Sequence, residues 1–188
     1  MLHDIVPRDY QCNIANSVLE NGSTLVVLPT AMGKTVIAAM VVDKMLKKGK
    51  VLFLAPTRPL VEQHAKSMKK ILGLKEDEVC HITGFILPEK RGEEYASHKI
   101  VCATPQCINN DIQNGIIDLS GYALVIFDEA HRAAGEYAYV PIANEYANQN
   151  PDAFTLGLTA SPGSSKVKIN QIKNNIHVNR VESRTEVD

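Results

Sequence analysis

The chain has 188 residues, a formal net charge of −1 and 45% hydrophobic residues. This length fits one domain that can bury a sizeable core, and the composition is that of an ordinary globular protein. The nearly balanced charge excludes a uniformly basic surface, so any nucleic-acid binding has to be argued from local groups of residues. No apolar run approaches the ~18 residues of a membrane helix, and the N-terminus lacks a signal-peptide pattern. We therefore expect a cytoplasmic protein with no membrane partner.

The cysteine pattern favours reduced thiols over zinc binding or disulfides. The four cysteines are Cys12, Cys80, Cys102 and Cys107, and no two of them form a C-x-x-C pair. Cys80 and Cys102 stand inside apolar runs, as buried thiols of intracellular proteins do. A redox or metal role is therefore the weaker interpretation.

Short apolar runs and helical patterns alternate along the chain. The runs cover residues 24–28, 51–55, 78–82, 99–103, 122–127 and 154–158. Most are apolar at consecutive positions, as in strands that are covered on both faces. Helical patterns lie between them at residues 34–48, 58–72, 105–114 and 139–149. This alternation predicts an α/β fold with a mostly parallel sheet of about six to seven strands and helices on both faces.

The last part of the chain is polar and charged, with one short apolar patch at Ile176–Val178. We expect a helix there, a possible edge strand and then an exit segment. The predicted domain covers residues 1–178, and residues 179–188 are predicted to begin a linker.

The first polar signature is the loop in LVVLPTAMGKTVIAAM, residues 25–40. The usual phosphate-binding pattern G-x-x-x-x-G-K-[ST] has a glycine where this chain has Leu28, so the only glycine of the loop is Gly33. A helix that begins at Gly33 or Lys34 offers free N–H groups and partial positive charge to phosphate oxygens. Lys34 would reach the β- and γ-phosphates of a nucleotide, and the Thr35 hydroxyl would ligate Mg²⁺. A chance GKT in a turn is the alternative.

The second signature is YALVIFDEAHRAAG, which delivers Asp128 and Glu129 to the end of a strand. A strand-terminal aspartate holds Mg²⁺ in nucleotide hydrolases, and a neighbouring carboxylate can orient and deprotonate the attacking water. An acidic helix start is the alternative for this motif alone. Because the GKT loop follows an earlier strand of the same predicted sheet, the pair of motifs predicts a nucleotide-binding α/β domain.

Two further features suggest contacts between strand ends. His131 has a spacing suited to bridging toward another strand, and Thr159 and Ser161 follow a buried run in LGLTASPG. Their hydroxyls could bond a neighbouring histidine or carboxylate. The second feature is weak by itself, because Ser-Pro-Gly is a common turn.

The order of motifs resembles that of a known family. RDYQ, PTAMGKT, PTRPL, TG, TPQ, DEAH and TAS follow one another as in the first motor lobe of superfamily 2 helicases. The runs LPTAMGKTVIAAM, VLFLAPTRPLVEQH, ATPQCINNDI and FDEAHRAAGEYAYV are similar to the branch of archaeal Hef helicase-nucleases and Fanconi anaemia M translocases. The resemblance implies a RecA-like fold, ATP and Mg²⁺ as cofactors, forked or branched DNA as partner, and a second lobe. It also implies a nucleoid-associated protein of an archaeal cell.

The resemblance assigns more residues to each ligand. Arg8 and Gln11 match the motif that reads adenine, although Gln11 can also be an ordinary polar residue of a helix. The phosphate loop would include Thr30, Ala31 and Met32, and His131 with Thr159 and Ser161 would couple the nucleotide state to lobe movement. The residues expected to hold nucleic acid are Thr57, Arg58, Thr83, Gly84, Thr104, Pro105 and Gln106.

These nucleic-acid groups are hydroxyls, a guanidinium and helix-start N–H groups, which suit phosphate oxygens rather than base edges. Such contacts bind one strand with little sequence preference. Thr83 and Thr104 can alternatively be plain helix caps.

The sequence departs from the pattern at Ala31, where relatives usually have glycine. If this position needs positive φ, alanine costs about 1 kcal/mol against glycine and weakens ATP binding. Without a second lobe and its arginines, the chain is expected to bind ATP weakly and to hydrolyse it poorly. Two alternatives stay open: a lobe of a double-stranded RNA-dependent ATPase of the RIG-I-like or Dicer kind, and a degenerate non-hydrolysing ATP-gated nucleic-acid-binding module.

Overall fold

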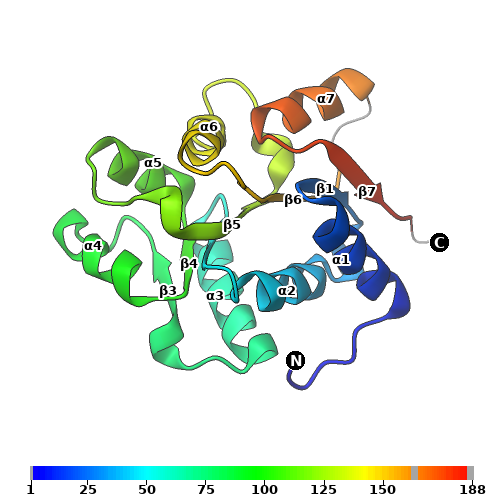
Figure 1. Ribbon diagram of the computed structural model, residues 1–188, viewed down its shortest axis with the longest axis horizontal. Helices are drawn as coiled ribbons and strands as arrows, with labels where there is room; N and C mark the ends of the chain where they lie inside the picture. The colour runs from blue at the N-terminus through cyan, green and yellow to red at the C-terminus, as the bar shows by residue number, and fades with distance from the viewer. Residues whose placement is uncertain (1, 162–164, 186–188) are drawn as a thin grey trace.

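The computed structural model describes residues 2–161 and 165–185. Within these ranges seven strands form one sheet, in the order β3-β4-β2-β5-β6-β1-β7 (Figure 1). The strands are β1 (Thr24–Val27), β2 (Lys50–Leu54), β3 (Val79–Ile82), β4 (Ile100–Ala103), β5 (Tyr122–Asp128), β6 (Thr155–Thr159) and β7 (Arg180–Ser183). Every neighbouring pair is parallel. The predicted α/β class with its parallel sheet is confirmed.

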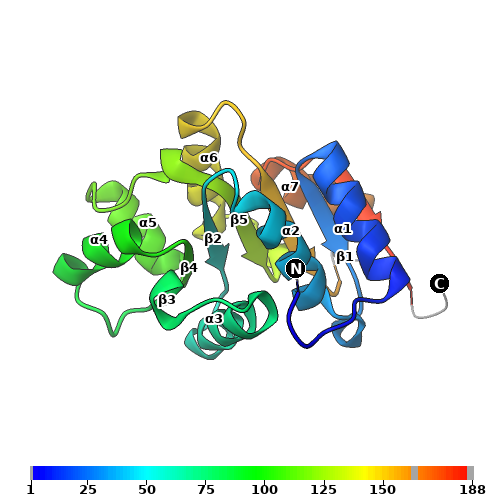
Figure 2. The same cartoon turned by 60° about the horizontal axis from the view of Figure 1, so that its bottom comes forward.

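Helices cover both faces of the sheet (Figures 1 and 2). One buried cluster joins the sheet to α1 (Asp9–Asn21), α2 (Lys34–Met45) and α3 (Arg58–Leu72). A second cluster joins the other face to α4 (Pro88–Ser97), α5 (Pro105–Gln113), α6 (Tyr139–Gln149) and α7 (Lys166–Asn175). The molecule therefore has three layers, with the sheet in the middle.

The consecutive apolar residues of the strands are explained by this burial on two faces. In β2, Phe53 belongs to the cluster under α1–α3, whereas Leu52 and Leu54 belong to the cluster under α4–α7. All three are fully buried. Because successive side chains of a strand point to opposite faces, only a strand covered on both sides is apolar at every position.

Helices α1 and α4 were not among the predicted ranges. In α4 the sequence PEKRGEEYAS buries only Arg91 and Tyr95, so it has no apolar stripe that could indicate a helix. The helical patterns at 34–48 and 105–114 end slightly earlier than expected, at Met45 and Gln113.

The predicted domain boundary at residue 178 falls before the last strand. β7 pairs in parallel with β1, and Glu182 on β7 accepts a hydrogen bond from the Ser17 hydroxyl on α1. The possible edge strand expected in this part of the chain is therefore present, although three of its four residues are exposed and no apolar run marks its bounds. Residues 186–188 of the expected linker lie outside the described residues.

The four cysteines are free thiols, and Cys80, Cys102 and Cys107 are buried. Over residues 2–161 and 165–185, we find no helix with both the length and the apolar character of a membrane span.

Candidate nucleotide and nucleic-acid site

Apart from Arg8 and Gln11, which lie at the start of α1, the predicted site residues lie along one edge of the sheet, because each follows the carboxyl end of a parallel strand. The segments after β1, β5 and β6 are adjacent, since these three strands are neighbours in the sheet. We call them the phosphate-loop half of the edge. The segments after β2, β4 and β3 form the other half, which we call the β2–β4–β3 half.

The phosphate loop leaves β1 at a fully buried Leu28, whose N–H donates to the Thr159 carbonyl of β6 at 3.0 Å. Residues 30–32 then form a short 3₁₀ turn, and Gly33 leads into α2 with φ of 75°. A Cβ atom at Gly33 would lie 2.3 Å from Nε2 of Gln11. Glycine is therefore required at this position both by its backbone conformation and by the space around it.

Helix α1 is bonded to this loop through two side chains. Gln11 is buried, its Oε1 accepts from the Arg8 N–H at 2.9 Å, and its Nε2 donates to the Met32 carbonyl at 3.2 Å. The Tyr10 hydroxyl donates to the same carbonyl at 2.8 Å. The side chain of Arg8 is exposed. Tyr10 was not among the predicted site residues, although its place beside Gln11 in RDYQ was the available signal.

Lys34 begins α2, and its ammonium group folds over the loop. Nζ donates to the carbonyls of Leu28 at 2.9 Å and Pro29 at 3.4 Å. Partial burial lowers the pKa of Lys34, and the negative charge of Asp128 opposes this shift. The Lys34 ammonium thus lies near the Asp128 carboxylate. A phosphate group would compete with the two loop carbonyls for the hydrogen bonds of this ammonium.

The positive φ considered for Ala31, and the backbone strain that would follow from it, are absent from this loop. Among the described non-glycine residues, positive φ occurs at Asp4, Glu129 and His177. Ala31 instead lies in the right-handed turn Thr30–Met32 and is exposed. Alanine adopts this backbone without the cost that a left-handed conformation would carry.

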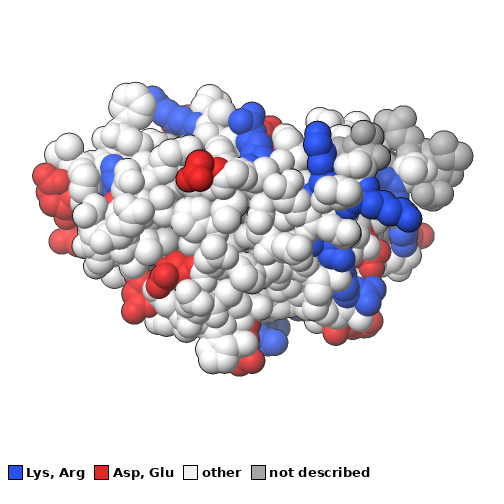
Figure 3. All heavy atoms as spheres, turned by 90° about the horizontal axis from the view of Figure 1, so that it is seen from above, with Lys and Arg blue, Asp and Glu red and all other residues white. Residues whose placement is uncertain are grey.

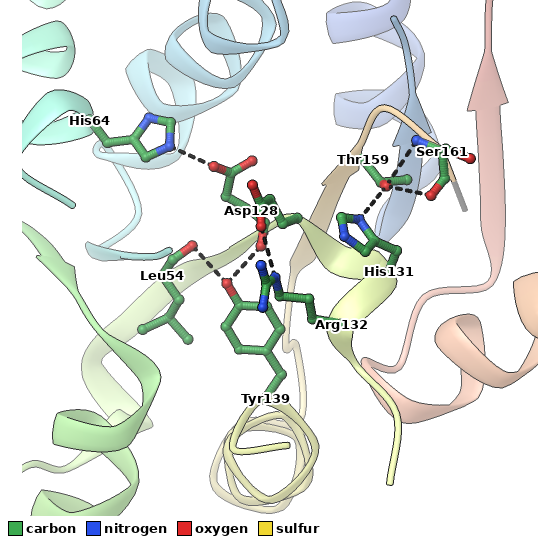
Figure 4. A network of polar contacts seen from close by, with 9 residues as sticks. Leu54, His64, Asp128, His131, Arg132, Tyr139, Thr159 and Ser161 are labelled. Carbon is green, nitrogen blue, oxygen red and sulfur yellow. Dashed lines mark hydrogen bonds and ion pairs between the residues drawn. The ribbon is translucent and has the colours of Figure 1, made fainter. Parts of the chain in front are cut away.

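Asp128 ends β5 and is oriented by a histidine from another element (Figure 4). Nε2 of His64, on α3, lies 2.7 Å from Oδ2 of Asp128, and both side chains are largely buried. The His64 ring stacks on Phe53 with centroids 4.3 Å apart. Nδ1 of His64 is buried without a hydrogen-bond partner among the described residues. With Nε2–H donating to the carboxylate, the ring has one fixed orientation.

His64 was missed by sequence reasoning. It occupies the buried face of α3 together with Val61, Ala65 and Met68. A polar residue inside this apolar stripe was the available signal, but its partner lies 64 positions away in the chain.

Tyr139 fixes the backbone of the same strand end. Its hydroxyl donates to the Asp128 carbonyl at 2.6 Å and lies 3.3 Å from the Leu54 carbonyl of β2. Burial, with smaller effects of Tyr137 and Asp128, raises the pKa of Tyr139 well above its ordinary value. The side chain therefore stays a neutral donor that ties α6 to the ends of β2 and β5.

Glu129 has a strained backbone and a paired carboxylate. Its φ and ψ are both 49°, in the left-handed region that costs a non-glycine residue about 1–2 kcal/mol. Oε2 accepts from Nε of Arg132 at 2.8 Å. Such strain in a residue next to the Asp128 carboxylate is typical of functional sites.

The contact expected of His131 is present. Its Nδ1 lies 3.0 Å from the Thr159 hydroxyl at the end of β6. Thr159 is buried, and its Oγ1 also lies 3.1 Å from the Ser161 carbonyl and accepts from the Ser161 N–H at 3.3 Å. The three residues are brought together from two strand ends, and their role in coupling stays a prediction.

The β2–β4–β3 half is more open. Thr57 and Arg58, Gly84, and Gln106 are exposed, whereas Thr83 and Pro105 are buried. Thr57 and Thr104 precede α3 and α5, but neither side chain makes a capping hydrogen bond. Thr83 lies five residues before the start of α4 at Pro88. Thr104 therefore has the position of a plain helix cap, although without a side-chain hydrogen bond, and Thr83 does not.

Charge is unevenly distributed on the face formed by α6 and α7. Figure 3 shows Lys and Arg side chains gathered toward the end of the molecule that carries α7 and β7. Helix α7 contributes Lys166, Lys168 and Lys173. The net charge of −1 thus hides a local basic region.

Comparison with known proteins agrees with this architecture. The model of the family "Type III restriction enzyme, res subunit" matches residues 4–164. The crystal structure of the Pyrococcus furiosus Hef helicase domain is 46% identical and has a TM-score of 0.92, covering 97% of this chain and 39% of that one. MJ1505 of Methanocaldococcus jannaschii, which is named as an ATP-dependent RNA helicase, is 46% identical over 183 residues. The ATP-dependent DNA helicase fml1 of Schizosaccharomyces pombe is 39% identical over 183 residues.

These relatives are much longer than the matched region. The alignments cover 96% and 95% of this chain but only 23% of MJ1505 and 22% of fml1. What these alignments share is thus a region of the size of one domain. The chain belongs to the family described as type III restriction enzyme, res subunit, and is a RecA-like helicase domain similar to that of Hef.

Proposed function

We propose that this chain is the N-terminal, ATP-binding lobe of an ATP-dependent DNA helicase or translocase that acts on forked or branched DNA. The observation that carries the proposal is the phosphate-loop half of the sheet edge. Neighbouring strands there present the Gly33–Thr35 loop, the carboxylates of Asp128 and Glu129, and the His131–Thr159 contact. The names of fml1 and Hef support the helicase assignment.

The donor groups of this half fit a nucleotide with Mg²⁺. Mg²⁺ is bound by hard oxygen ligands, and the Asp128 carboxylate and Thr35 hydroxyl are of this kind. When bound, the ion would neutralise negative charge on the phosphate oxygens. His64 holds Asp128 in one orientation, and the loop carries a cation, Lys34, for the phosphates.

Each residue then has a defined task. The N–H groups at the start of α2 and the Lys34 ammonium hold phosphate oxygens. Glu129 orients the attacking water once its carboxylate releases Arg132 and accepts a hydrogen bond from the water instead. Gln11 holds the loop through Met32 and offers its amide to adenine with Arg8. His131, Thr159 and Ser161 transmit the nucleotide state to the second lobe.

The β2–β4–β3 half supplies contacts to the DNA backbone. Its exposed hydroxyl and guanidinium groups suit phosphates, so binding is independent of sequence. Mechanical work would come from two lobes that close on ATP and reopen after hydrolysis. The corresponding location is the nucleoid of an archaeal cell.

The test is calorimetric titration of the chain with ATP, with and without Mg²⁺, beside Lys34→Ala. We expect weak binding that Mg²⁺ strengthens and that Lys34→Ala removes. Binding that is indifferent to Lys34 would contradict the proposed site. Turnover of ATP by the isolated chain should be slow, and robust DNA-stimulated turnover by a monomer would contradict the need for a second lobe.

A second candidate is a double-stranded RNA-dependent ATPase. It is favoured by the name of MJ1505 and by contacts that cannot distinguish DNA from RNA unless a 2′-hydroxyl is read. In the two-lobe protein, fork DNA should stimulate turnover more than duplex RNA does, and the reverse result would favour this candidate. A turnover that Lys34→Ala abolishes would also exclude a non-hydrolysing ATP-gated module.

A further inference from the structure

We propose that Phe85 is a stacking platform for a nucleobase of a single-stranded segment bound along the β2–β4–β3 half. This inference rests on the proposed nucleic-acid binding and adds a base contact to it. Phe85 lies between β3 and α4, directly after Thr83 and Gly84, and 78% of its surface is exposed.

The exposure of Phe85 sets it apart from the other phenylalanines. Phe53 and Phe127 are fully buried, and Phe154 packs partly buried against the core. Among the described residues, the other exposed large hydrophobic side chains are all aliphatic: Val6, Leu87, Val167 and Val181. An exposed phenylalanine lacks the stabilisation of about 1.5–3 kcal/mol that burial of its side chain would give, so packing in the core does not explain a phenylalanine at position 85.

A cation lies against the ring. Cζ of Arg58, the first residue of α3, is 4.0 Å from the centroid of Phe85. Nε of Arg58 also donates to Oε1 of Glu62 at 2.8 Å, and half of the arginine side chain is exposed. The guanidinium is therefore held in place by a ring and a carboxylate. It can exchange the carboxylate for a phosphate oxygen without leaving the ring.

The combination of groups indicates the kind of partner. Proteins that bind single strands independently of sequence combine cationic backbone contacts with aromatic rings on which bases stack. Arg58 provides the cation, with the exposed Thr57 and Gly84 nearby in the same half, and Phe85 provides the aromatic ring from an adjacent segment. Because every base has a π-face, stacking on Phe85 keeps the site independent of sequence.

The chain has no tryptophan, so Phe85→Trp places a single tryptophan, which can be excited apart from the six tyrosines, at the proposed contact. Its fluorescence would be measured during titration with an oligo-dT strand and with an abasic strand of the same length. We expect quenching by oligo-dT and little change with the abasic strand. Val6→Trp, at a residue that is 94% exposed and lies before α1, outside the β2–β4–β3 half, is the control and should respond to neither. Equal quenching of the Phe85→Trp protein by both strands would overturn stacking.

Affinity gives an independent readout. Phe85→Ala and Phe85→Leu should each weaken oligo-dT binding about 10-fold, whereas Phe85→Tyr, which keeps a ring, should bind within about two-fold of wild type. ATP affinity and the melting temperature should not change, because the side chain is exposed. Wild-type affinity in Phe85→Leu would show that the ring is not a platform.

The same titrations separate this inference from the proposed function. If wild type binds oligo-dT, Arg58→Ala weakens it and Phe85→Ala does not, only the stacking inference fails. If the wild-type chain binds neither strand at low salt, the proposed nucleic-acid binding fails together with the stacking inference. If Phe85 instead binds an apolar protein partner, that partner needs the ring, while oligo-dT changes neither the Trp fluorescence nor its affinity among the Phe85 variants. This result also overturns the proposal.

Discussion

The two halves of the carboxyl edge differ in how their side chains are held. In the phosphate-loop half, Gln11, Asp128 and Thr159 are buried and bonded to neighbouring strand ends or helices. In the β2–β4–β3 half, Arg58 and Phe85 project into solvent. A small ligand that must be placed accurately calls for preorganised groups, whereas a polymer backbone needs an open surface. The edge thus contains one rigid site and one open track.

Helix α3 connects the two halves. It begins with Arg58 on the open side and, less than two turns later, carries His64 to the Asp128 carboxylate. A shift of α3 on binding a strand would therefore be felt at Asp128. The following variants test whether the two halves act separately, and they are ordered from the largest to the smallest expected change in ATP turnover, ATP affinity or oligonucleotide affinity.

Asp128→Asn removes the negative charge at the end of β5 while keeping the shape of the side chain. ATP turnover in the two-lobe protein should fall about 100-fold or more, because the charge that would hold Mg²⁺ is lost. Oligonucleotide affinity should stay within about two-fold, since the Asp128 side chain is buried and is not one of the exposed groups of the open half. Steady-state hydrolysis measures ATP turnover, and filter binding measures oligonucleotide affinity. An equal loss of turnover and affinity would mean that the two halves of the edge do not act separately.

His64→Ala removes the partner of Asp128 and leaves a cavity beside Phe53. The Mg²⁺-dependent part of ATP affinity should fall about 10-fold, and the free energy of unfolding should fall by about 1–3 kcal/mol. His64→Gln, whose amide can donate to the same carboxylate, should restore most of both. His81→Ala, at an exposed histidine of β3, is the matched control and should change neither quantity. If His64→Ala lowers only the free energy of unfolding and leaves the Mg²⁺ dependence of ATP affinity unchanged, His64 has only a packing role.

Arg58→Ala acts on the open half. Oligonucleotide affinity should fall about five-fold, and the slope of log affinity against log salt should drop by about one, as for the loss of one phosphate contact. Arg58→Lys should keep the slope because it keeps the charge. ATP affinity measured in parallel should not change, and a parallel loss would indicate that Arg58 acts through α3 on Asp128.

Ala31→Gly should have the smallest effect. Since Ala31 does not have positive φ, we expect ATP affinity within about two-fold of wild type, contrary to the strain expected from the sequence pattern. Gly33→Ala is the contrasting variant, because its Cβ would meet Gln11 and its backbone is left-handed. Tighter binding by Ala31→Gly would show that the nucleotide-bound loop needs another conformation at this residue.

Much of the edge could be predicted because local signals and the geometry of parallel sheets agree. Apolar runs that end in GKT, DEAH and TAS predict strands, and parallel strands bring their carboxyl ends together. This is why Lys34, Asp128 and Thr159 lie along one edge, as expected. The fold class could be predicted for the same reason. Helix α4 could not, because it buries only Arg91 and Tyr95 and shows no periodic pattern, whereas an edge strand was expected in the tail but without bounds.

The sequence by itself determined the parallel α/β sheet, the helix start at Lys34 and the strand-terminal carboxylates, because these depend on short-range patterns. Only the tertiary structure decided that His64 orients Asp128, that Tyr139 ties α6 to two strand ends, and that Arg58 lies on Phe85. Each of these pairs joins different elements of the chain. Their contacts depend on strand order and helix packing, and no local pattern encodes which distant residue will be the partner.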